Sequence, residues 1–128
     1  MSSACFFFSI HEPFFLRRYN VFDLGQNSMY EDDEKNCAHI RQVTQQCYLP
    51  ALETFLRQIE ATDGKFKFAC HISIPALDLF EQYTPEVIAV LQKLAKTGSV
   101  EFVAGAAHSL AFLYSRTEFG RQLKTYKL

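Results

Sequence analysis

The chain begins with a short apolar run that ends abruptly in charged and conformationally restricted residues. Residues 4–10 read ACFFFSI, and His11, Glu12 and Pro13 follow directly. An apolar run without a turn residue predicts a strand of a parallel sheet that is covered on both faces. Polar groups at the carboxyl end of such a strand lie where α/β proteins build their binding sites. The sequence therefore predicts an α/β fold with a binding site at this edge of the sheet.

Composition and charge narrow the class of protein. Apolar residues make up 48% of the 128 residues and aromatic residues 15%, which predicts one globular domain rather than a disordered chain. The 13 Lys and Arg residues against 14 Asp and Glu residues give a formal charge of −1, so we expect no nucleic-acid partner and no membrane partner. The N-terminus shows no signal-peptide pattern and no apolar stretch long enough to cross a bilayer, which predicts a cytoplasmic protein.

The four cysteines show no CxxC spacing and lie within apolar or helical patterns. Such positions favour four buried thiols over two disulfides. They are Cys5, Cys37, Cys47 and Cys70.

The segment that follows the first strand changes from irregular to helical. Residues 14–30 form an irregular loop, of the kind in which function tends to concentrate. From Asp32 an acidic first turn and a helical period predict a helix, which Pro50 interrupts. A second amphipathic stretch ends at Gly64, so the two pieces are expected to form one kinked or broken helical hairpin.

Two further strands are predicted, each preceded by helical sequence. Apolar stretches predict strands over residues 66–74 and 99–104. Further helices are expected around residues 77–80, from the Thr84 cap to Gly98, and from residue 117 onward. Alternating strands and helices imply right-handed crossovers and a parallel sheet of about three strands.

Three histidines fall at or just after predicted strand ends, with two carboxylates nearby. These residues are His11, His71, His108, Glu12 and Glu101. Taken alone, His71 is interpreted as a hydrogen-bonded core or rim residue. The chain has no HExxH and no His-x-His spacing, so the pattern predicts no metal site.

Glu101 is an unusual residue for an apolar strand, because a buried carboxylate is costly unless it is paired. Strand alternation places Val100 and Phe102 on one face and Glu101 with Val103 on the other. We therefore expect Glu101 to face either a polar interior or solvent.

Five short motifs follow one another along the chain. They are HEPFFLRRY (11–19), FDLG (22–25), YEDD (30–33), CYLP (47–50) and GSVEF (98–102). In this order they resemble the N-terminal part of glycoside hydrolase family 57, in its α-amylase-like branch. The resemblance covers essentially the whole chain. It implies that residues 1–128 form the N-terminal portion of an incomplete (β/α)7 barrel, truncated at the C-terminus, with about three parallel strands and intervening helices.

The resemblance also assigns four substrate-binding residues. His11 matches the histidine of the family's His-Gln-Pro motif, which lines a sugar subsite, and Glu12 stands where the family usually has Gln. Glu101 matches the glutamate of the second family motif, and His108 resembles a histidine that follows it in several branches. Residues 103–107 are small and apolar where the amylase-like branch carries acidic and aromatic residues.

Members of this family cleave or transfer α-glucan chains with retention, so the resemblance implies an α-glucan or maltooligosaccharide ligand and no cofactor. A retaining mechanism needs two carboxyl groups about 5 Å apart across the scissile bond. The family's nucleophile and proton donor match no residue here and are expected beyond residue 128. The chain alone is therefore predicted to contain no catalytic residue and to be inactive.

Two other interpretations remain open at the level of sequence. The first is a metal-dependent carbohydrate deacetylase that is related by fold and uses His11, His71 and His108 as metal ligands. The second is a non-catalytic subunit or assembly module that docks a complementary chain, or associates with itself, through an open sheet edge.

Overall fold

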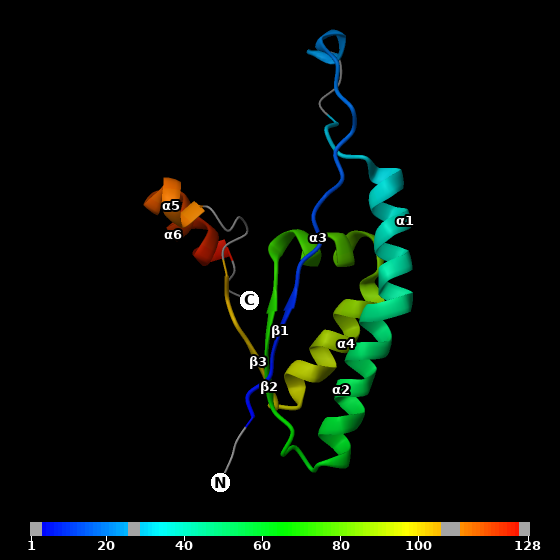
Figure 1. The fold of residues 1–128 in the computed structure, drawn as a ribbon, viewed down its shortest axis with the longest axis vertical. Helices are drawn as coiled ribbons and strands as arrows, with labels where there is room; N and C mark the ends of the chain where they lie inside the picture. Colours follow the sequence, from blue (N-terminus) through cyan, green and yellow to red (C-terminus); the bar gives the residue numbers. More distant parts are fainter. Residues whose placement is uncertain (1–3, 26–28, 106–110, 126–128) are drawn as a thin grey trace.

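A three-stranded parallel sheet lies at the centre of the molecule, in the order β1-β2-β3 (Figure 1). The structure is a computed structural model that describes residues 4–25, 29–105 and 111–125. The strands are β1 (Phe7–Ile10), β2 (Phe68–Ile72) and β3 (Val100–Phe102). This arrangement confirms the predicted α/β fold with an open parallel sheet, although each strand is shorter than its apolar run.

Helical segments connect the strands and flank the sheet. They are the 3-10 turn η1 (Val21–Asp23), α1 (Asp33–Val43), the π-helical turn η2 (Thr44–Tyr48), α2 (Leu49–Ala61), α3 (Ile74–Tyr83), α4 (Pro85–Lys96), α5 (Ala111–Tyr114) and α6 (Arg116–Thr125). In Figure 1, α1 to α4 lie on one side of the sheet, and α5 and α6 lie apart from them. No helix in the described part of the chain is long and apolar enough to cross a membrane.

The predicted hairpin around Pro50 is wrong, because α1, η2 and α2 form one continuous helical rod (Figure 1). The residues at both junctions, Thr44 and Leu49, keep right-handed helical backbone angles. The Leu49 N–H bonds to the Thr44 carbonyl five residues earlier, which widens the turn just before the proline. Pro50 then occupies the first turn of α2, where a missing backbone donor is tolerated.

Local signals mark most other element ends as expected. The Asp32 side chain accepts a hydrogen bond from the Lys35 backbone N–H at 3.2 Å and so caps α1. Gly64 and Gly98 adopt positive φ angles of 72° and 69° beyond the ends of α2 and α4. Thr84 precedes α4, but its side chain does not cap the helix. Its buried hydroxyl instead accepts a hydrogen bond from the Thr44 hydroxyl at 3.3 Å, which ties η2 to the start of α4.

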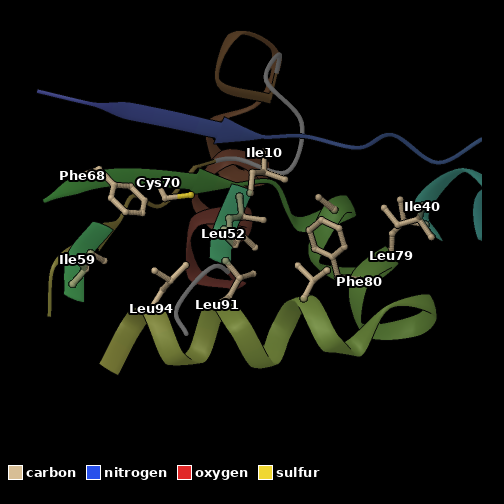
Figure 2. Packing of buried hydrophobic residues seen from close by; sticks show 13 residues of the cluster. Ile10, Ile40, Leu52, Ile59, Phe68, Cys70, Leu79, Phe80, Leu91 and Leu94 are labelled. Carbon is tan, nitrogen blue, oxygen red and sulfur yellow. The ribbon is translucent and has the colours of Figure 1, made fainter. Parts of the chain in front are cut away.

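The hydrophobic core lies between the sheet and the helices on one side of it (Figure 2). Figure 2 shows Phe68 and Cys70 directed from β2 toward Leu91 and Leu94 of α4. The core residues are apolar and at most 9% exposed: Ile10, Ile40, Leu52, Ile59, Phe68, Cys70, Ile72, Ala76, Leu79, Phe80, Val87, Leu91 and Leu94. We call the sheet face that contacts this core the covered face.

The opposite face of the sheet, which we call the open face, carries exposed side chains. Phe7 on β1, whose side chain alternates with the covered Phe8, is 59% exposed. The expectation that the first strand is covered on both faces is therefore wrong within the described residues. The reason is topological, because all the helices between β1 and β3 lie on the covered side (Figure 1).

The cysteines are all free thiols, but only one of them is buried as expected. Cys70 points into the core, and burial raises the pKa of its thiol to about 11. Cys5, which precedes β1, is exposed. On the helical rod, Cys47 is exposed and Cys37 is half-buried, because the buried side of the rod carries Asn36, Ile40 and Thr44 instead.

Candidate functional site

The carboxyl ends of the three parallel strands meet at one edge of the sheet. His11 follows β1 directly at this edge, and its side chain is exposed. Alternation along the strand places His11 on the open face with Ser9, since Ile10 between them is buried in the core. The structure thus places an exposed imidazole at the edge where the sequence predicts a binding site.

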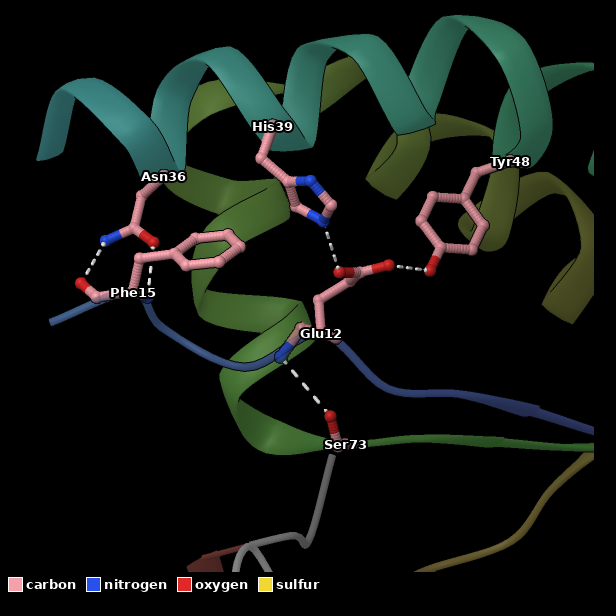
Figure 3. Close-up of polar contacts among 7 residues, drawn as sticks. Glu12, Phe15, Asn36, His39, Tyr48 and Ser73 are labelled. Carbon is pink, nitrogen blue, oxygen red and sulfur yellow. Dashed lines mark hydrogen bonds and ion pairs between the residues drawn. The ribbon is translucent and has the colours of Figure 1, made fainter. Parts of the chain in front are cut away.

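Glu12 points the opposite way, toward the helical rod on the covered side (Figure 3). It is only 8% exposed, and its carboxylate lies between two side chains of the rod. The His39 Nε2–H donates to one carboxylate oxygen at 2.9 Å, and the Tyr48 hydroxyl donates a short hydrogen bond to the other. Burial, together with the adjacent Glu12 carboxylate, raises the pKa of Tyr48 far above its ordinary value.

The same rod also holds the backbone three residues further along. The Asn36 side chain accepts a hydrogen bond from the Phe15 N–H at 2.7 Å and donates to the Phe15 carbonyl at 3.3 Å (Figure 3). The Phe15 ring also packs edge-on against the imidazole of His39, with the ring centroids 5.1 Å apart. Asn36 is 2% exposed, so both hydrogen bonds are shielded from water.

Together these contacts form a clasp, defined by Glu12, Phe15, Asn36, His39 and Tyr48, that fixes the chain just after His11. The clasp holds residues on both sides of Pro13, namely Glu12 and Phe15, and the proline ring further restricts the backbone between them. Because Glu12 is anchored on the covered side, alternation directs its neighbour His11 to the open face. The Glu12 carboxylate is therefore buried and hydrogen-bonded to the helical rod, while His11 is exposed.

Beyond the clasp, residues 16–25 and 29–31 lie in a projecting arm rather than a wholly irregular loop (Figure 1). Leu16 and Glu31 make an antiparallel bridge, and the Arg17 N–H donates to the Tyr30 carbonyl at 2.9 Å. The arm therefore begins and ends at the same place, beside the clasp.

On the open face, the row of residues next to His11 is polar. Ser9 on β1 and His71 on β2 are register partners, and a hydrogen bond of 3.2 Å joins Ser9 Oγ to His71 Nδ1. Gly105, which follows β3, lies against the same imidazole, so that a Cβ added there would fall 2.2 Å from His71 Nε2. The His71 imidazole therefore contacts both Ser9 of β1 and Gly105, which follows β3.

Glu101 lies on β3 with its side chain exposed on the open face, opposite Ala69 of β2. Its neighbours Val100 and Phe102 pack against the core, which confirms the predicted alternation. Among the residues of β1, β2 and β3, Glu101 is the only carboxylate. His108 lies outside the described residues.

The open face is a polar surface. It offers hydroxyl, imidazole and carboxylate groups beside exposed aromatic rings, which together can hydrogen-bond and pack against an uncharged polar ligand. Within residues 4–25, 29–105 and 111–125, no group of three or more His, Cys, Asp or Glu side chains is placed to hold a metal ion.

Sequence reasoning placed His11 and His71 at strand ends with Glu101 nearby, and the structure shows that all three lie on the open face. It missed the residues that organise this region. Asn36, His39 and Tyr48 were not recognised as partners of the strand end. A signal was present, since Asn36 and His39 are spaced for the same helix face as the buried Ile40. Polar residues on the buried side of an amphipathic helix need hydrogen-bond partners, and the strand end supplies them.

Comparison with known proteins identifies the family. Residues 5–127 match the sequence profile of Glycosyl hydrolase family 57. A protein of Methanocaldococcus jannaschii named "Putative alpha-amylase" is 26% identical over 129 aligned residues, which cover 95% of this chain and 26% of that protein. The chain thus spans about a quarter of that relative's length, and no solved structure was found to match it. Because the family profile covers nearly all of the sequence, the chain belongs to glycosyl hydrolase family 57.

Proposed function

We propose that this chain supplies part of the sugar-binding rim of a retaining, α-glucan-active glycoside hydrolase of the α-amylase or glucanotransferase type. His11, Glu101 and His108 are its sugar contacts, and Glu12 positions His11 through the clasp. The observation that carries the proposal is the opposed orientation of His11 and Glu12, which directs an imidazole onto a polar sheet face and anchors it from behind.

The chemistry of the open face suits a glucan chain. A pyranose ring has apolar faces that can pack on an exposed ring such as Phe7, and hydroxyl groups that bond to imidazole and carboxylate groups. Parallel α/β sheets bind ligands at the carboxyl ends of their strands, where His11 lies. A relative named for an amylase adds support for an α-glucan.

The same geometry leads us to propose that these 128 residues bind glucan without cleaving it. Retaining hydrolysis requires two carboxyl groups about 5 Å apart, one as nucleophile and one as acid. The described strands present a single carboxylate, Glu101, on the open face, because Glu12 is engaged by His39 and Tyr48 on the other side. Cleavage then depends on carboxyl groups supplied from outside these strands.

Affinity electrophoresis tests the binding proposal. The chain should migrate more slowly in a native gel that contains amylose than in one that contains cellulose fragments, and His11→Ala should abolish most of the retardation. Gln92→Ala, on the exposed side of α4, serves as the control and should migrate like the parent chain. Equal migration of the parent chain in both gels would contradict the proposal.

Product analysis tests the proposed lack of cleavage. Incubation of the chain with amylose or maltooligosaccharides should release no new reducing ends. Robust hydrolysis by the chain alone would show that the catalytic pair lies within it.

We also propose that the open face takes part in association, either with a complementary chain or with a second copy. The supporting observation is the exposure of Phe7 on an edge strand whose outer side is unpaired among the described strands. Sedimentation velocity tests this proposal, because association should increase with protein concentration and decrease in Phe7→Ser. A compact monomer at all concentrations would contradict it.

A further inference from the structure

The arm beyond the clasp carries a concentration of exposed apolar side chains. They are Leu16 (68% exposed), Val21 (70%), Phe22 (86%), Leu24 (66%) and Tyr30 (57%). The apolar side chains that form or border the core include none from residues 16–25 or 29–31. In Figure 1 the arm also stands away from the sheet and the long helices. These side chains are therefore left uncovered by the described body of the chain.

Local contacts hold the arm in one conformation. The Arg17 N–H donates to the Tyr30 carbonyl at 2.9 Å and joins the two sides of the arm, and the Tyr19 ring packs against the Tyr30 ring with the centroids 5.0 Å apart. At the start of η1, the Asn20 N–H donates to the Asp23 carboxylate at 2.8 Å, and the Asp23 N–H donates to the Asn20 carbonyl at 3.0 Å. An ordered surface loses little freedom on binding, which favours its use in recognition.

The charges on the arm are balanced. Residues 16–31 contain two cationic side chains, Arg17 and Arg18, and two anionic ones, Asp23 and Glu31, so their formal net charge is zero. Two copies of such a surface can meet about a two-fold axis with opposite charges side by side, whereas copies of a surface of one sign would repel. The two carboxylates also disfavour contact with an anionic membrane.

The size and chemistry of the exposed surface suit a protein partner. From their exposed fractions, the five apolar side chains present on the order of 700 Å², close to the roughly 800 Å² that each partner contributes to a standard interface. Leu16, Val21 and Leu24 are aliphatic and lack the flat ring on which a sugar packs. Exposed apolar patches of this size mark interaction sites on soluble proteins.

We propose that the arm is a dimerisation element that packs against the arm of a second copy of this chain about a two-fold axis. The apolar side chains form the centre of this interface, and the arginines and carboxylates form its charged edge. The surface is separate from the open face, so the inference does not depend on the proposed sugar binding.

Sedimentation velocity tests the inference. The dimer fraction of the parent chain should rise with protein concentration, and Phe22→Ser should weaken dimerisation about 10- to 100-fold, as expected for the loss of a central aromatic anchor. Tyr114→Ser in α5 (Ala111–Tyr114) is the matched control, because this ring is 82% exposed and lies outside the arm. It should dimerise like the parent chain. In dilute solution all three chains should have the same melting temperature.

Charge reversal tests whether the partner is a second copy. Arg17→Glu with Arg18→Glu replaces two positive charges by two negative ones and changes the net charge of the arm from 0 to −4, whereas Glu31→Arg changes it from 0 to +2. Each variant alone should dimerise more weakly than the parent chain, because like charges then face each other. An equal mixture of the two should dimerise more strongly than either alone.

Three results would overturn the inference. The first is a parent chain that stays monomeric at all concentrations, including one that binds vesicles of phosphatidylcholine and phosphatidylglycerol through Phe22, which would assign the arm to a membrane surface. The second is a dimer that survives Phe22→Ser but is lost in Phe7→Ser, which would leave only the association proposed for the open face. The third is a mixture of the charge variants that dimerises no better than its components.

Discussion

The two faces of the small sheet differ sharply although the same strands form both. On the covered face, β2 presents Phe68, Cys70 and Ile72, all buried at 5% exposure or less. On the open face, the same strand presents Ala69 and His71, and β1 presents Ser9 and the exposed Phe7. Stability therefore resides on one face, and the groups that suit ligand binding lie on the other.

The contrast explains how an ordinary core can support a polar site. Because side chains alternate along a strand, a residue anchored on the covered face fixes its neighbours on the open face. Glu12 and His11 are the clearest example, since the clasp that holds Glu12 lies behind the sheet from the exposed imidazole. Substitutions on the two faces should consequently affect different measurements.

The largest expected effect is the difference between two phenylalanines on opposite faces. Phe68→Ala removes a ring that is 5% exposed and packs against Phe8, Phe55 and Phe66, so it should lower the free energy of unfolding by about 3 to 4 kcal/mol. Phe7→Ala removes a ring that is 59% exposed and should cost less than about 1 kcal/mol. Urea denaturation measures both. Similar losses would show that the open face is packed in solution.

Two carboxylates provide the second comparison. Glu12→Ala leaves the Tyr48 hydroxyl and the His39 ring without their buried acceptor, so it should lower the free energy of unfolding by about 2 to 3 kcal/mol. Glu101→Ala, on the open face, should change it by less than about 0.5 kcal/mol. Urea denaturation measures the free energy of unfolding of both variants. A large loss in Glu101→Ala would mean that this carboxylate has a structural partner.

A double-mutant cycle sharpens the interpretation of Glu12. If the clasp acts as a unit, Glu12→Ala and Tyr48→Phe together should destabilise the chain by about 1 kcal/mol less than the sum of the single effects. Additive effects would show that the hydrogen bond between the two side chains contributes little.

Much of the fold could be predicted from the sequence because its signals are local. The apolar runs of the three strands, the acidic first turn of α1 and the glycine turns at Gly64 and Gly98 are each set by residues that lie close together in the sequence. The alternation around Glu101 was also predictable, since side chains along a strand alternate with a period of two.

The errors arose where distant contacts or a shift in helical hydrogen bonding decide the outcome. An apolar run such as residues 4–10 has the same composition whether helices cover one face or both. The helical rod continues through Pro50 because η2 shifts the hydrogen-bond spacing before it, which a residue pattern does not reveal. The partners of Glu12 lie 27 and 36 residues away along the chain, so the clasp becomes visible only in the folded structure.

The smallest expected effect is the pH dependence of stability that Cys70, the buried thiol of the covered face, should cause. Burial raises the pKa of Cys70 from 9.0 to about 11, so between these values the unfolded thiol ionises while the folded one stays neutral. Its contribution to stability is complete below about pH 9 and is lost as the pH rises toward about 11. By about pH 10 the loss should be about 1 kcal/mol.

A comparison of variants separates the contribution of Cys70 to stability from those of other groups that titrate at high pH, such as Tyr48. Urea denaturation at about pH 7 and about pH 10 should show a smaller loss of stability in Cys70→Ala than in the parent chain. Cys47→Ala removes an exposed thiol and should keep the full loss. If Cys70→Ala also kept the full loss, the thiol would be accessible to water in solution, and the covered face would be less tightly closed than its packing indicates.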